Sequence, residues 1–107
     1  TCTRARPDQT SIIEAALQDG LTLGPAFAET SPKGDVYIGA NILRGTDRIS
    51  SADVWVYRNG SPFALSSDAR SKSSIADGRK LGLSAGDDTG TKVQGCVVAQ
   101  TRKDNGG

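Results

Sequence analysis

One stretch, residues 53–66 with the sequence DVWVYRNGSPFALS, constrains the fold of this chain more than any other. Asn59-Gly60 lies between two apolar runs, and this dipeptide favours a two-residue hairpin turn because both positions accept a positive φ angle. Such a turn also fixes the pairing of the two strands, with Trp55 opposite Ala64. We therefore expect a β-hairpin here.

The two faces of this hairpin carry different side chains. One face carries four apolar residues: Val54, Val56, Phe63 and Leu65. Trp55 and Tyr57 lie on the other face, because residues alternate along a strand. Pro62 has no N–H to donate to a further strand, so we expect the return strand at an edge of the sheet. The edge formed by residues 63–66 is then a place where a partner strand can add.

The length of 107 residues suits a single domain, residues 1–107, with one modest core. The net charge of +1 argues against the dense basic surface that nucleic-acid binding requires. We find no apolar run long enough to span a membrane and no signal peptide. These features fit a cytosolic protein or a mature secreted chain whose leader has been removed.

Two cysteines, Cys2 and Cys96, lie at opposite ends of the chain. We favour a disulfide between them, which would tie the polar N-terminus to an apolar segment and indicate an oxidising compartment. Two alternatives remain open. Cys96 can be a buried free thiol with Cys2 incidental, or Cys2 can be the acylation site of a bacterial lipoprotein.

The N-terminal half of the chain predicts one helix and then strands. Residues 1–10 are polar and are expected to be extended, and Ser11-x-x-Glu14 has the form of a capping box at the start of a helix that ends before Gly20. A strand interrupted at Gly24-Pro25 is expected at residues 21–30, with its better part at 26–29, and the best central strand of the chain lies at residues 35–43.

The remaining segments are more polar. We expect a polar loop at 44–52, a short helical piece at 73–77, a weak strand at 80–84, a turn at 86–90, a final strand at 93–101 and a frayed tail at 102–107. The chain is therefore predicted to be an α+β domain: a mostly antiparallel sheet of four to six strands with one N-terminal helix packed on one face. The alternative is an all-β sandwich or a partly closed barrel with a peripheral helix.

Catalytic motifs are hard to find in this chain. It has no histidine, which removes the commonest general base and the usual zinc ligands, so we expect no metal and no cofactor. Asp87-Asp88-Thr89-Gly90 lacks the spacing of a calcium loop, and we interpret it as a polar turn. We name no catalytic residues. A small secreted hydrolase or toxin-like enzyme using Asp, Glu, Arg and Tyr side chains is the alternative to a non-catalytic role.

The aromatic side chains give the best candidate binding residues. If Tyr37 on the central strand shares a face with Trp55 and Tyr57, the three form an aromatic face on the sheet, and such a face is typical of a binding surface. The competing arrangement, which we favour, covers this face with residues 67–92, so that Ile75, Leu81 and Leu83 pack on Trp55.

We therefore expect a secreted, periplasmic or cell-envelope domain of bacterial character. Its expected role is that of a non-catalytic accessory module that recognises a protein or a small ligand, not a nucleic acid. A monomer or a weak dimer fits its size.

Overall fold

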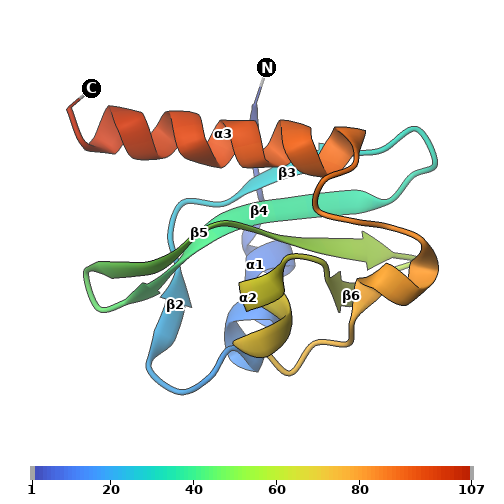
Figure 1. Ribbon diagram of the computed structural model, residues 1–107, viewed down its shortest axis with the longest axis horizontal. Coiled ribbons are helices and arrows are strands. Elements are labelled where there is room, and N and C mark those ends of the chain that lie inside the picture. Colours follow the sequence, from blue (N-terminus) through green and yellow to red (C-terminus); the bar gives the residue numbers. More distant parts are fainter. Residues whose placement is uncertain (1, 107) are drawn as a thin grey trace.

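The computed structural model describes residues 2–106, and its centre is a six-stranded antiparallel sheet that does not close, with helices packed against it (Figure 1). In chain order the elements are β1 (Thr3–Arg4), α1 (Pro7–Ala16), β2 (Leu21–Leu23), β3 (Phe27–Thr30), β4 (Val36–Arg44), β5 (Asp47–Arg58), β6 (Ser61–Ala64), α2 (Ser67–Ser71), the 3-10 helix η1 (Gly78–Leu81) and α3 (Asp88–Asp104). The predicted α+β class is confirmed, and the sheet forms neither the alternative sandwich nor a barrel.

The strands follow the order β1-β3-β4-β5-β6, and β2 pairs with the far half of β4. Strands β4 and β5 form one long hairpin that runs through most of the polar stretch 44–52, where we predicted a loop. That prediction was wrong because both strands extend to a tight turn at Gly45, where their side chains are exposed and polar residues are tolerated.

The predicted hairpin at Asn59-Gly60 is confirmed. Strands β5 and β6 pair in the expected register, with Trp55 opposite Ala64, and Asn59 and Gly60 have φ angles of 53° and 80°. The outer edge of β6 is not open at Ala64, because the Ala64 N–H donates to the carbonyl of Ala76 at 2.8 Å. The chain's own segment therefore covers the edge at which we expected a partner strand.

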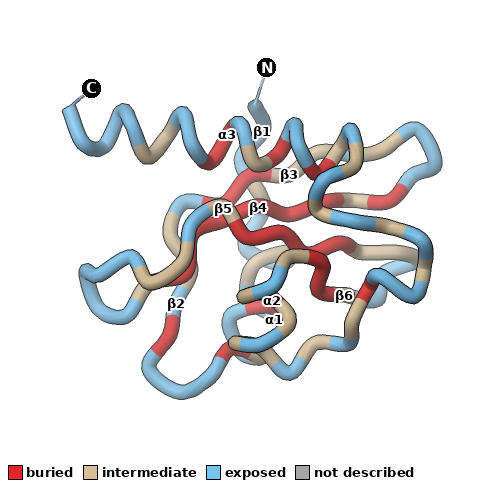
Figure 2. The backbone as a smooth tube through the Cα atoms, in the orientation of Figure 1, coloured by how far each residue is buried: buried red, intermediate tan, exposed pale blue. Residues whose placement is uncertain are grey.

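The sheet is buried on both faces, and Figure 2 shows its central strands as the most buried part of the molecule. Helices α1 and α2 cover one face, where the main buried side chains are Ile13, Leu17, Ile38, Ile42, Trp55 and Ala69. Helix α3 covers the other face, where they are Phe27, Tyr37, Val54, Val56, Leu65, Val93 and Val97. We had predicted one helix on one face, and α3 is the helix that the prediction missed.

Helix α1 begins at Pro7, four residues before the predicted capping box, so residues 7–10 are helical and not extended. Proline is suited to the first helical position because its fixed φ angle is already helical and its missing N–H has no partner there. The side chain of Gln9 accepts the Arg6 N–H at 2.8 Å. Glu14, our expected capping-box partner, instead accepts the N–H of Leu23 at 3.0 Å.

Helix α3 contains residues 93–101, which we predicted to be the final strand, and residues 102–104, which we placed in a frayed tail. The side chain of Asp87 caps the helix by accepting the N–H of Gly90 at 2.9 Å. A Cβ atom on Gly90 would lie 2.3 Å from the carbonyl oxygen of Ala85, so this close start of the helix requires glycine. The strand prediction failed because packing and capping outweighed the β-propensity of the valines.

Two smaller predictions within the polar stretch 67–92 were also wrong. The short helix α2 lies at Ser67–Ser71, before the predicted 73–77, and residues 80–81 belong to η1, not to a weak strand. Ile75 packs against the core that contains Trp55, as expected for the covered arrangement, whereas Leu83 packs against the core on the α3 face.

A disulfide joins Cys2 to Cys96, as predicted, and attaches the N-terminal segment to the middle of α3. The two residues are 94 positions apart in the sequence. Because the bond forms a loop that contains most of the chain, it restricts the unfolded state strongly.

Candidate functional site

The site begins with the turn between β3 and β4. Its backbone is closed by the N–H of Gly34, which donates to the carbonyl of Ser31 at 2.9 Å, and by the N–H of Asp35, which donates to the Ser31 hydroxyl at 3.2 Å. The carboxylate of Asp35 is 5% exposed and accepts two hydrogen bonds from the Arg58 guanidinium, at 2.8 and 2.9 Å. This pairing holds the pKa of Asp35 below its usual value.

Tyr37 connects this end of the sheet to helix α3. Its ring is buried beneath the helix, and its hydroxyl donates to the carboxylate of Asp87 at 2.6 Å. Burial raises the pKa of the Tyr37 phenol, and the hydrogen bond to Asp87 raises it further. The phenol is therefore a neutral hydrogen-bond donor across the physiological pH range.

A surface hollow of about 310 Å³ opens next to this hydrogen bond. We call it the Tyr37 hollow, and its lining residues are 31–33, Asp35, Tyr37, 82–83 and 87–89. Figure 1 shows the β3–β4 turn and the first turn of α3 next to each other at the right-hand end of the molecule. Pro32 and Leu83 give the hollow its apolar surface, whereas Tyr37 is only 2% exposed there. The hollow therefore combines apolar surface with a few fixed polar groups, as ligand sites do.

The three aromatic residues predicted as binding residues do not form one open face. Tyr37 lines the hollow on the α3 face, whereas Trp55 is fully buried on the opposite face of the sheet. The cause is the pairing of β4 with β5, in which Ile38 lies opposite Trp55 and Tyr37 lies opposite Val56. We had placed Ile38 and Val56 on one face of the sheet and Tyr37 and Trp55 on the other. In the structure Ile38 shares a face with Trp55, and Tyr37 shares the opposite face with Val56.

Tyr57 lies on the same face as Trp55 and is half-buried. Its hydroxyl donates to the backbone carbonyl of Gln9 in α1 at 2.6 Å. Tyr57 also lines a smaller hollow of about 230 Å³ together with Ile12, which is 49% exposed. A single exposed isoleucine is common on protein surfaces, so this smaller hollow is the weaker candidate.

Sequence reasoning missed most of the Tyr37 hollow. We interpreted Asp87-Asp88 as a turn, although an aspartate followed by an acidic first turn and an i, i+3, i+4 apolar pattern (Val93, Cys96, Val97) is a helix-start signal. The sequence also contained a signal for the ion pair between Asp35 and Arg58. The hairpin register and the start of the central strand together bring these two residues to the same end of the sheet.

One buried carboxylate lies away from the hollows. Asp53 is 3% exposed and accepts hydrogen bonds from the hydroxyls of Ser50 and Ser66, and burial raises its pKa. None of the hollows described above is lined by Asp53. Its environment is that of a structural group, because each of its two oxygens accepts a hydrogen bond from a serine hydroxyl within the fold.

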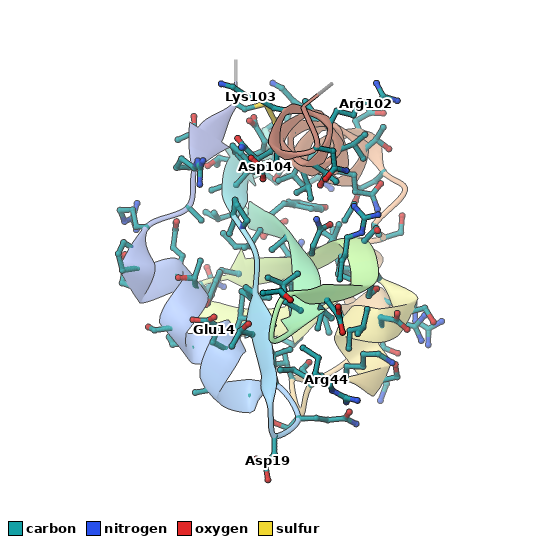
Figure 3. The ribbon with its side chains drawn as sticks, turned by 90° about the vertical axis from the view of Figure 1, so that its left-hand side faces the viewer. Glu14, Asp19, Arg44, Arg102, Lys103 and Asp104 are labelled. Carbon is teal, nitrogen blue, oxygen red and sulfur yellow. A yellow bond between two sulfur atoms is a disulfide. The ribbon has the colours of Figure 1, made fainter. Side chains whose placement is uncertain are left out.

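Charged residues at the opposite end of the molecule show no comparable arrangement. Figure 3 shows that end, where Arg102, Lys103 and Asp104 lie together at the end of α3, well separated from Arg44 and Asp19. Within residues 2–106, no three Cys, Asp or Glu side chains form a group that could hold a metal ion, and none of the helices is long and apolar enough to cross a membrane.

Comparison with protein families, with curated proteins and with solved structures finds no match to this chain.

Proposed function

We propose that this chain is a non-catalytic recognition module that binds a small ligand or a segment of a partner protein in the Tyr37 hollow. The observation that carries this proposal is the hollow of about 310 Å³, with apolar walls and fixed polar groups. Its volume lies at the lower end of the range of about 300–1,000 Å³ that is common for ligand sites.

The protonation of the polar groups favours binding over catalysis. A general acid or base works best when its pKa lies near the working pH. The Arg58 guanidinium lowers the pKa of Asp35, and burial raises the pKa of Tyr37, so both groups keep one protonation state around neutral pH. The Asp87 carboxylate accepts hydrogen bonds from Tyr37 and from two backbone N–H groups, which fixes its position. Such groups orient a ligand without transferring a proton.

The disulfide supports a location outside the cytoplasm, in a secreted or cell-envelope protein. Disulfides such as Cys2–Cys96 persist in oxidising compartments and are rare in the cytosol of mesophiles. The net charge of +1 gives no reason to propose nucleic acid as the partner.

The proposal is tested by titrating the ¹⁵N-labelled protein with a set of small neutral, cationic, anionic and zwitterionic compounds and following amide shifts by NMR. We expect shifts at Leu83 and Thr89, which line the hollow. The substitution Leu83→Glu should remove them because it brings a charge to an apolar wall. Leu83→Ala serves as a second variant in case the charge disturbs folding.

The matched control is Leu81→Glu, two residues earlier and outside the hollow, which should keep the shifts. Shifts confined to another surface, or no shifts with any compound, would overturn the proposal.

A further inference from the structure

The charges around the Tyr37 hollow indicate what kind of ligand it takes. Two of its carboxylates already have partners: Asp35 forms a bidentate pair with Arg58, and Asp87 accepts hydrogen bonds from Tyr37 and the backbone. Two charged side chains remain. Among the ion pairs of residues 2–106, neither Lys33 nor Asp88 takes part in one.

These two charges come from different elements. Lys33 belongs to the turn between β3 and β4, and Asp88 is the first residue of α3. Both line the same hollow, yet they form no ion pair with each other. A hollow lined by one unpaired cation and one unpaired anion complements a molecule that carries both charges.

We propose that the Tyr37 hollow binds a small zwitterion with an apolar side chain, the chemistry shared by free amino acids and short peptides. The ligand ammonium lies at Asp88, the ligand carboxylate lies at Lys33, and the ligand side chain packs against Pro32 and Leu83. This inference rests on the proposed function, because it assigns a ligand to the same hollow.

The charges around the Tyr37 hollow also disfavour two other classes of ligand, polyanions and polycations. A polyanion would place negative charge next to Asp87 and Asp88, and a polycation would place positive charge next to Lys33 and Arg58. Like charges in close proximity disfavour binding. The volume of about 310 Å³ also favours a small molecule over a folded partner.

The test uses L-leucine as the probe, in the same NMR titration at low salt. Two analogues each lack one charge: N-acetyl-L-leucine has no ammonium, and L-leucinamide has no carboxylate. An exposed ion pair changes affinity by a small factor, so we expect each analogue to bind the wild type about two- to fivefold more weakly than L-leucine.

Two variants assign the charges. In Asp88→Asn, L-leucine and N-acetyl-L-leucine should bind equally, because the partner of the ammonium is gone. In Lys33→Gln, L-leucine and L-leucinamide should bind equally. The matched controls Asp104→Asn and Lys103→Gln, at the other end of α3, should keep the wild-type preferences.

The dipeptide Leu-Leu distinguishes the two ligand sources. Tighter binding of the dipeptide, with the same dependence on both charges, identifies a short peptide, and tighter binding of L-leucine identifies an amino acid. If both analogues bind as well as L-leucine, the proposal of a zwitterionic ligand is wrong, although the hollow is still a binding site. The proposed function fails as well only when no compound of the wider set binds there.

Discussion

The carboxyl group of Asp53 illustrates how single residues are stabilised in this fold. It is 3% exposed and accepts a hydrogen bond from the Ser66 hydroxyl at 2.6 Å and another from Ser50. The Ser66 hydroxyl in turn accepts the N–H of Val54 at 3.0 Å. Burial raises the pKa of Asp53, whereas the guanidinium of Arg58 lowers the pKa of Asp35. The two carboxylates should therefore affect stability with opposite dependence on pH.

For Asp53 the folded pKa lies above the unfolded value of 3.8, so its contribution is fully present below that pH and is lost as the pH rises through the folded pKa. The free energy of unfolding of the wild type minus that of Asp53→Asn should fall as the pH rises above about 4. Urea unfolding between about pH 3 and pH 7 measures this difference. A difference that does not change with pH would contradict the buried environment assigned to Asp53.

For Asp35 the folded pKa is lowered, so its contribution to stability is lost as the pH falls. The free energy of unfolding of the wild type minus that of Asp35→Asn should therefore decrease as the pH falls below about 4.

At the scale of elements, the contact between helix α3 and strand β4 depends on Gly39. A Cβ atom at this position would lie 3.1 Å from methyl groups of both Val93 and Val97. Valine side chains in a helix have one preferred rotamer and do not easily move aside. The absent side chain therefore sets how closely the helix can approach the sheet.

We expect Gly39→Ala to lower the free energy of unfolding by about 1–3 kcal/mol, the usual cost of overpacking a core. The matched control is Gly95→Ala, in the exposed part of the same helix, where an added Cβ would have no atom within 4 Å. That substitution should raise stability by up to about 1 kcal/mol, because alanine favours a helix more than glycine does. Thermal or urea unfolding of both variants tests the pair. Equal effects of the two substitutions would show that α3 does not pack closely on β4.

Helix α3 also shows where sequence reasoning succeeds and where it fails. The hairpin at Asn59-Gly60 was predicted in its register because the turn residues specify it locally. The segment GCVVA in α3 was predicted as a strand because β-branched residues favour strands. Its helical form depends on the Asp87 cap and on burial of Val93 and Val97 against distant strands. A single sequence shows the first kind of signal clearly and the second kind only weakly.

At the scale of the whole molecule, the register in which β4 pairs with β5 decides which side chains share a face of the sheet. Alternation within each strand was predicted correctly, yet the pairing of Ile38 with Trp55 divides the aromatic residues between two cores. That pairing follows from the turn at Gly45 together with two register shifts between Ala40 and Leu43, opposite a polar part of β5 whose sequence shows no sign of them. The Tyr37 hollow was missed for a different reason: it forms where the β3–β4 turn and the start of α3 come together in space.

The Cys2–Cys96 disulfide stabilises the whole chain and one element in particular. In the chain-entropy model, closing a loop of this length stabilises the folded state by about 4–5 kcal/mol. Strand β1 has two residues, both exposed, so its pairing with β3 provides little stability without the covalent link. We therefore expect reduction to affect both the global free energy of unfolding and the local order of β1.

Urea unfolding with and without a reductant should show the global loss, and the double variant Cys2→Ser/Cys96→Ser should reproduce it without any reductant. Hydrogen exchange should show the local effect. The Ala5 N–H, which donates to the carbonyl of Ala26 at 3.0 Å, should exchange much faster in the reduced protein. The N–H groups of Ile38 and Val56 in the buried centre of the sheet should remain the slowest to exchange. Unchanged exchange at Ala5 would show that β1 is held by its own contacts, and unchanged stability would show that the disulfide does not restrict the unfolded chain.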